Sequence, residues 1–219
     1  MNPFPIVLSA PSGGGKTTVT KRLMDRRKDI GYSVSCTTRP PRPGEVNGVD
    51  YEFLTEKEFN AHREAGDFAE WAVVHGKFYG TLKSAVAKVL AGGKHVMMDI
   101  DVQGASQVAG AWPQAVLIFM LPPSVEVLLA RLEARNTEDG ATLLTRLKSA
   151  HAELQAVTRY HYVLVNDDLE STVARVSSII DAEEVSRDRV RALDSQLQGL
   201  ITTLDSEIRR QTAGGSGPH

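Results

Sequence analysis

The chain has 219 residues, of which 42% are hydrophobic and 24% charged, a composition that excludes a disordered protein and allows one or two domains with a buried core. Its 25 basic residues nearly balance its 27 acidic residues, and the net charge of −2 argues against a general nucleic-acid binder. The single cysteine, Cys36, excludes a disulfide framework, and no apolar run reaches the ~18 residues of a membrane span. Because the first residues also lack a signal-peptide pattern, we expect a cytoplasmic protein without a membrane partner.

Short apolar runs alternate with longer amphipathic segments along most of the chain. Four runs are apolar throughout, as in the strands of a buried parallel sheet: residues 6–8, 95–98, 115–121 and 162–165. Helical periodicity occupies other segments: residues 16–28, 83–91, 102–110, 124–134, 142–157 and 169–185. This order predicts an α/β fold in which helices flank a parallel sheet through right-handed crossovers.

Two segments interrupt this alternation. Residues 33–81 are first proline-rich, then strand-like at 51–54, helical at 56–65 and strand-like again at 68–74. We expect a small mixed α+β insertion there, on a core formed by residues 1–32 and 82–185. Residues 135–140 contain no apolar side chain, which predicts a mobile polar loop within a lid of about residues 131–146.

The most specific motif follows the first predicted strand and opens the first helix. It reads Ala10-Pro11-Ser12-Gly13-Gly14-Gly15-Lys16-Thr17-Thr18, the pattern of a phosphate-binding loop except that alanine replaces the first glycine. Glycines let consecutive backbone N–H groups point at phosphate oxygens, and the helix N-terminus adds its positive end. Lys16 would reach the β- and γ-phosphates, and the Thr17 hydroxyl would be a ligand of Mg²⁺. A plain glycine-rich turn is the alternative, but the motif favours nucleoside triphosphate binding by Ser12, Gly13, Gly14, Gly15, Lys16, Thr17 and Thr18.

The next distinctive segment along the chain, residues 35–45, is rich in proline. Its prolines favour a polyproline helix, which would place Arg39 and Arg42 on one face roughly 9 Å apart. Two guanidinium groups at that spacing can bind one phosphate group. An exposed proline-rich ligand of the P-x-x-P type explains the same residues, and the segment alone leaves both alternatives open.

Further motifs decide between these alternatives by resemblance. In chain order they are Ser35 to Gly44, Asn47-Gly48-Val49-Asp50-Tyr51, Gly66-Asp67-Phe68-Ala69-Glu70-Trp71, Tyr79-Gly80-Thr81 and Asp99-Ile100-Asp101-Val102-Gln103-Gly104. Their order and spacing resemble the guanylate kinase family from Phe4 to about Glu184. The resemblance implies a phosphate-loop core with a GMP-binding insertion and a polar lid. It also implies an enzyme that converts ATP and GMP to ADP and GDP with Mg²⁺.

The resemblance assigns roles to individual residues. It implies that the GMP phosphate is held by Ser35, Arg39, Arg42, Tyr51 and Tyr79, and that the base is read by Glu70, Thr81 and Asp101. Asp99 is also implied as a GMP-binding residue, and it resembles the acid that organises nearby arginines or water bound to Mg²⁺, the ion that Thr17 would bind. Three arginines of the lid would close over the transferred phosphoryl group: Arg131, Arg135 and Arg146. Asn166 and Asp167 would lie near the adenine of ATP.

The residue chemistry agrees with these roles. The Glu70 carboxylate can accept from both guanine donors, N1–H and the exocyclic amine, whereas the bare N1 of adenine would oppose it, a mismatch worth ~10⁴ in discrimination. The acceptor phosphate is already ionised, so the reaction needs no general base. Positive charge would come instead from Mg²⁺, Lys16, Arg39, Arg42 and the lid arginines.

Plainer explanations exist for single residues and for the whole chain. Glu70 alone would be a surface carboxylate, Asp101 a helix N-cap, the tyrosines core residues, and the lid arginines solvated. A binding module that resembles guanylate kinase is the main alternative function, but such modules have degraded phosphate loops. A related kinase for AMP, dTMP or a ribose bisphosphate is the second alternative. We expect ATP and GMP as substrates, dGMP as a further candidate, and a monomer or a homodimer.

The last part of the chain lies beyond the resemblance. Apolar residues recur there at helical spacing, which predicts an amphipathic helix over residues 186–208: Val190, Leu193, Leu197, Leu200, Leu204 and Ile208. Fewer than three heptads are present, and Gly199 costs about 1 kcal/mol relative to alanine. Pairing between subunits, packing on the chain's own domain and fraying all remain open. Residues 209–219 are expected to form a flexible tail.

Overall fold

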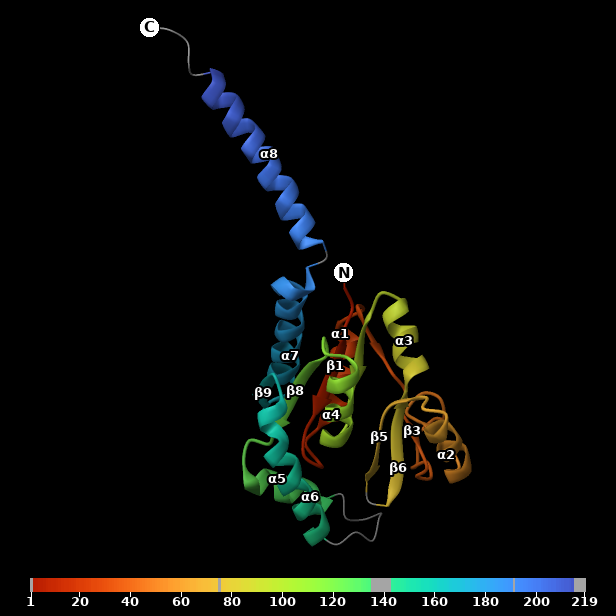
Figure 1. Cartoon of the computed structure of the whole chain (residues 1–219). Helices are drawn as coiled ribbons and strands as arrows, with labels where there is room; N and C mark the ends of the chain where they lie inside the picture. Colours follow the sequence, from red (N-terminus) through yellow and green to blue (C-terminus); the bar gives the residue numbers. More distant parts are fainter. Residues whose placement is uncertain (1, 75, 135–142, 191, 215–219) are drawn as a thin grey trace. The chain divides into compact units, whose positions relative to one another are not determined.

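The computed structural model describes residues 2–74, 76–134, 143–190 and 192–214, and side chains at 133, 134, 143, 146, 213 and 214 are not described. The chain divides into two compact units, one spanning Pro3–Ile179 and one from Ile180 onward (Figure 1). Of the helices in the described part, none is both long and apolar enough to traverse a bilayer.

The first unit contains a parallel sheet of five strands in the order β2-β7-β1-β8-β9. The strands are β1 (Pro5–Ser9), β2 (Ile30–Tyr32), β7 (His95–Met98), β8 (Val116–Leu121) and β9 (Tyr162–Val165). All residues of β1 and β7 are buried, because helices cover the sheet (Figure 1). Residues 162–165 form the predicted strand, β9, but the prediction that it is buried is wrong: β9 is an outer strand, and its Val163 and Val165 are exposed. The helices of this unit are α1 (Lys16–Arg26), α3 (Lys83–Ala91), α4 (Val102–Ala111), α5 (Val125–Ala134), α6 (Leu143–Gln155) and the short η1 (Ala156–Arg159). Helix α7 (Leu169–Glu184) begins in this unit, and its last residues, from Ile180 on, belong to the second. The predicted α/β fold is confirmed.

The edge strand β2 was not predicted from the sequence. It has only three residues, too few to show a periodic pattern. Its middle residue, Gly31, lies against Val89 of α3, and a Cβ at Gly31 would come within 2.5 Å of the Val89 Cγ1 atom. Glycine therefore allows α3 to pack closely on this edge of the sheet, and a larger residue would have to displace the Val89 side chain.

A second sheet of four strands, in the order β4-β3-β6-β5, forms within residues 36–82. Its elements are β3 (Cys36–Thr37), β4 (Glu52–Phe53), α2 (Glu56–Glu64), β5 (Phe68–Val74) and β6 (Lys77–Leu82). A capping box between Thr55 and Glu58 begins α2, and Phe59 of that helix stacks on Phe68 with ring centroids 4.4 Å apart. Cys36 belongs to the same buried cluster. The sequence predicted β5 and α2 but not β3 or β6, while the exact limits of an insertion at 33–81 stay a prediction.

The second unit includes η2 (Arg187–Arg189) and α8 (Leu193–Gly214). Helix α8 thus begins seven residues later than the predicted 186 and includes residues 209–214, which were expected to be a flexible tail. The late start has a local cause, because Ala192 adopts a left-handed conformation with φ 56°. The late end fits the helix-forming residues Glu207 to Gln211, while 215–219 lie outside the described residues.

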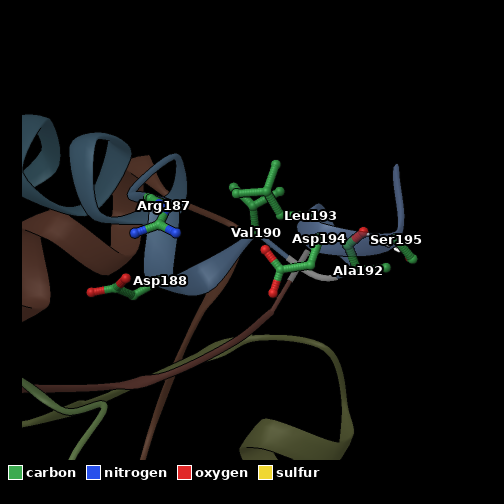
Figure 2. Close-up of a pocket in the computed structure, with 7 residues that line it drawn as sticks. All are labelled: Arg187, Asp188, Val190, Ala192, Leu193, Asp194 and Ser195. Atoms are coloured by element: carbon green, nitrogen blue, oxygen red, sulfur yellow. Dashed lines mark hydrogen bonds between the residues drawn. The ribbon is translucent and has the colours of Figure 1, made fainter. Parts of the chain in front are cut away.

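The stripe of apolar side chains on α8 is solvent-exposed. Leu200, Leu204 and Ile208 each retain about 60% of their accessible surface (63%, 61% and 62%). A hollow of about 410 Å³ lies at the start of the helix (Figure 2). Figure 2 shows its lining, which mixes charged and apolar side chains: Arg187, Asp188, Val190, Ala192, Leu193, Asp194 and Ser195.

Candidate active site

The loop between β1 and α1 has the geometry of a phosphate-binding loop. Gly13 and Gly15 adopt left-handed conformations with φ of 80° and 87°, which glycine tolerates best. A Cβ at Gly14 would lie 2.5 Å from the Ala10 Cβ and 2.8 Å from the Pro11 carbonyl oxygen. The Gly14 N–H donates to that carbonyl at 2.7 Å. The three glycines are thus each required by the tight turn that ends at the N-terminus of α1.

Two residues at the start of α1 connect the loop to the neighbouring strands. The Lys16 ammonium donates to the Ala10 carbonyl at 2.8 Å. The Thr17 hydroxyl donates to the Asp99 carboxylate at 3.0 Å, and the Tyr32 hydroxyl donates to its other oxygen at 2.6 Å. Burial raises the pKa of Asp99, although the hydrogen bond from Tyr32 and the charge of Lys16 oppose that rise. Asp99 therefore lies beside the loop, as the resemblance implies.

Two side chains from the C-terminal half of the first unit also contact the loop. The Ser12 N–H donates to Glu153 of α6 at 3.0 Å, and the Asn166 amide donates to the Gly14 carbonyl at 2.8 Å. Burial raises the pKa of Glu153, against the charge of Lys16. Asn166 is buried, whereas Asp167 is exposed. Asn166 thus supports the phosphate loop directly, a contact that was not predicted.

Arg39 is the centre of a second group of predicted residues. It retains only 7% of its surface, donates to Glu45 at 2.9 Å and to the Pro40 carbonyl at 2.7 Å, and lies 5.4 Å from the centroid of the Tyr51 ring. The Tyr51 and Tyr79 rings are 6.0 Å apart. Within the described residues the Arg39 Nε is buried and has no hydrogen-bond partner. A buried guanidinium with an unused donor is suited to an anionic ligand.

Glu45 is a residue whose role the sequence analysis missed. Its carboxylate accepts from the Arg39 guanidinium and, at 2.7 Å, from the Arg42 backbone N–H. Burial raises the pKa of Glu45, but these two hydrogen bonds together with the charges of Arg39 and Arg42 outweigh it and lower the pKa below its ordinary value. The acid therefore stays ionised and holds both arginines of the proline-rich segment in one loop. Its place at the end of that segment was the available signal.

A buried chain of polar side chains surrounds Glu70. The Thr81 hydroxyl donates to the Glu70 carboxylate at 2.6 Å, and the Ser35 and Thr81 hydroxyls are 3.1 Å apart. Burial raises the pKa of Glu70 to about 7; the Thr81 hydrogen bond opposes this rise, and the charge of Asp101 adds to it. The plain alternative, a surface carboxylate, is wrong because Glu70 retains only 3% of its surface.

Asp101 is the N-cap of α4. Its carboxylate accepts from the backbone N–H groups of Gln103 and Gly104 at 3.1 and 2.8 Å. A Cβ at Gly104 would clash with the Glu70 carboxylate, so the first turn of α4 lies directly against Glu70. The N-cap explanation of Asp101 is therefore confirmed, and its contact with a base stays a prediction.

The predicted lid arginines are only partly described. Arg131 of α5 lies against the phosphate loop, since a Cβ at Gly13 would come within 3.2 Å of the Arg131 Cβ. Among the described side chains, the Arg131 Nη1 is buried without a hydrogen-bond partner. Arg135 lies outside the described residues, and Arg146 belongs to α6 but its side chain is not described.

Residues 99–104 connect the phosphate loop to Glu70. The Asp99 carboxylate accepts from Thr17 at the start of α1 and from Tyr32. Two residues later Asp101 begins α4, and Gly104 of that helix lies against the Glu70 carboxylate. The sequence model of the guanylate kinase family matches residues 2–183. The chain belongs to the guanylate kinase family.

Individual relatives agree with this assignment. The chain is 44% identical over 206 residues to a guanylate kinase from Clostridium perfringens, which covers 94% of this chain and 93% of that protein. It is 45% identical over 188 residues to one from Caldanaerobacter subterraneus subsp. tengcongensis, covering 86% and 91%. The crystal structure of guanylate kinase from Anaplasma phagocytophilum superposes with a TM-score of 0.75 at 33% identity, covering 90% and 94%. The predicted family and enzyme class, a nucleoside monophosphate kinase, are confirmed.

Proposed function

We propose that this chain transfers the γ-phosphate of ATP to GMP and releases ADP and GDP. The observation that supports the proposal best is a buried carboxylate, Glu70, which lies against Gly104 of α4, five residues after the Asp99 that bonds Thr17 of the phosphate loop. The guanylate kinase relatives support the same reaction. Neither comparison favours a binding module, and the loop retains both Lys16 and Thr17.

The phosphate loop binds ATP. Its left-handed glycines turn backbone N–H groups toward the triphosphate, and Lys16 at the start of α1 neutralises charge on the β- and γ-phosphates. Asn166 keeps the loop in shape through the Gly14 carbonyl, and Arg131 adds charge from α5. Ser12, Thr18 and Asp167, and the lid residues Arg135 and Arg146, keep their predicted roles in ATP binding and closure.

The insertion binds GMP. Arg39, whose buried Nε has no hydrogen-bond partner among the described residues, and Arg42 bind the phosphate together with Ser35, Tyr51 and Tyr79. The ionised Glu70 accepts from guanine N1–H and the exocyclic amine, while Thr81 and Asp101 complete the base site. Adenine would place an acceptor against this buried acceptor, so AMP is rejected. None of the roles assigned here involves the ribose 2′-hydroxyl of GMP. We therefore expect dGMP as a candidate second acceptor.

The residues around Asp99 suit Mg²⁺. Hydroxyl and carboxylate oxygens are the ligands that this ion prefers, and Thr17 and Asp99 place both within 3.0 Å of each other. Thr17 would bind the ion directly, and Asp99 would bind it through water. When bound, Mg²⁺ neutralises charge on the β- and γ-phosphates and orients them.

The chemistry needs alignment rather than a base. The attacking phosphate oxygen of GMP is ionised, so no proton has to be removed before attack. Lys16 and the arginines hold two polyanions in line and stabilise the charge of the moving phosphoryl group. Closing of the lid excludes water, which would otherwise hydrolyse ATP. We expect this reaction in the cytoplasm, by a monomer or homodimer, without nucleic acid or membrane partners.

A coupled assay of ADP release tests the proposal. We expect turnover with Mg²⁺, ATP and GMP, and rates at least 10³-fold lower with AMP, dTMP or CMP. Equal activity with AMP would falsify the proposed specificity. Turnover with dTMP alone would assign the site to the related kinase, and absence of any turnover would assign the chain to the binding modules.

A further inference from the structure

Strand β5 is an outer strand of the four-stranded sheet, so one edge of its backbone has no neighbouring strand in the part of the chain that the structure describes. At Trp71 a side chain from α4 occupies that edge. The Trp71 N–H donates to the Gln107 carbonyl oxygen at 3.1 Å, and the Gln107 amide nitrogen donates to the Trp71 carbonyl at 2.7 Å. The carboxamide thus bonds both backbone groups of one residue, as a neighbouring strand would.

Trp71, the residue that Gln107 bonds, directly follows Glu70, the carboxylate that binds guanine in the proposed function. Pairing between β5 and β6 is irregular between Phe68 and Glu70, where a bulge occurs. A bulge re-aims the side chain beside it and weakens the local ladder. Glu70 therefore has less support from β6 on its N-terminal side, and the next residue is fixed by Gln107.

The same helix contacts the Glu70 side chain. Gly104, one turn before Gln107, lies so close to the Glu70 carboxylate that a Cβ there would clash with it. Asp101, which caps the helix, raises the pKa of Glu70 through its charge. Gln107 also donates weakly to the Gln103 carbonyl at 3.4 Å, which holds its side chain along the helix. One face of α4 thus touches both the side chain and the following backbone of the base reader.

We propose that Gln107 is a positioning residue for guanine recognition. This proposal rests on the proposed function, because in it Gln107 orients Glu70 toward the two hydrogen-bond donors of guanine. A carboxylate accepts from N1–H and the exocyclic amine together only when it lies in the plane of the base. The Gln107 amide holds the backbone at Trp71, and this fixes the direction in which the Glu70 side chain projects from β5.

The test compares Gln107→Leu with the full-length wild type in steady-state kinetics. Leucine keeps a similar volume but makes neither hydrogen bond. We expect the KM for GMP to rise about tenfold, with kcat and the KM for ATP within twofold. IMP has N1–H but lacks the exocyclic amine, so it gains less from exact alignment. The preference for GMP over IMP in kcat/KM is therefore expected to fall at least threefold.

Two further variants keep the test decisive. Ser106→Leu adds leucine at the neighbouring exposed position of α4 and should leave all constants unchanged. Gln107→Glu can accept from the Trp71 N–H but opposes its carbonyl, and it should raise the KM for GMP at least as much. If Gln107→Leu does not fold, Gln107→Glu decides the question alone.

Each outcome has one meaning. A wild type that does not phosphorylate GMP contradicts the proposed function rather than the role of Gln107. A wild type that does so, with unchanged GMP constants in the folded variants, overturns the role of Gln107. Parallel increases in the KM for GMP and for ATP, or an unchanged preference over IMP, would show a merely structural role and overturn it too.

Discussion

The phosphate loop and α8 obtain their hydrogen bonds over different ranges of sequence. In the loop, Thr17 bonds to Asp99 and Gly14 bonds to Asn166, partners 82 and 152 residues apart. In α8, the described side-chain hydrogen bonds join residues three or four apart, as from Thr202 to Gln198. The loop therefore has its functional shape only in the folded unit, whereas α8 is specified by its own sequence. Changes in the two regions should affect different properties.

The largest expected effect is in the phosphate loop. Lys16→Ala removes the ammonium that neutralises the transferred phosphate, and we expect kcat to fall by about 10³-fold or more with an unchanged circular dichroism spectrum. The matched control is Arg209→Ala on α8, which removes one positive charge far along the sequence and should leave kcat unchanged. Near-normal turnover of folded Lys16→Ala would contradict the loop assignment.

The second largest effect is expected at Glu70, the carboxylate proposed to bind guanine. Glu70→Gln replaces one acceptor by a donor, which would oppose a guanine donor in a buried site. We expect the Kd for GMP to rise about 10- to 100-fold and the Kd for ATP to change less than threefold, both measured by calorimetry. Equal losses for the two ligands would count against Glu70 as the base reader.

The raised pKa of Glu70, about 7, predicts a pH dependence. The ionised form binds guanine, so the KM for GMP should rise about tenfold for each pH unit below 7, where an ordinary carboxyl would still be ionised. The same shift means that the free protein gains stability from this group as the pH falls through 7. A phosphate monoester such as GMP has a second pKa of about 6, so Glu70→Gln provides the reference profile. Identical profiles for both proteins would rule out titration of Glu70.

The smallest expected effect is in the second unit. A chain ending at Glu184 lacks α8 with its exposed apolar stripe, and we expect its GMP kinetics within twofold of the wild type. Light scattering of both proteins then measures whether α8 pairs subunits. A truncated chain that keeps its mass state but loses GMP phosphorylation would show that the extension takes part in catalysis.

The sequence predicted what short-range patterns encode. The glycines and Lys16 of the phosphate loop, the buried strands β1, β7 and β8 and the order of helices follow from local spacing. The exposure of Val163 and Val165 in β9 does not, because an apolar run carries no sign that its strand lies at the edge of the sheet. The residues that contact the site from distant parts of the chain could not be predicted in this way. Glu153, Gln107 and Tyr32 contact the site through folding of distant segments, and no periodicity marks them. The start of α8 was missed for a different reason, because a single left-handed residue, Ala192, decides it.

Cys36 has a practical consequence. Its thiol is fully buried, and burial raises its pKa to about 12, so the reactive thiolate is scarce at neutral pH. It is also the chain's single cysteine. Maleimide reagents should therefore leave the native protein unlabelled, and a cysteine introduced at the exposed Ser206 would carry a fluorophore or spin label at one known position on α8 without prior removal of any native thiol.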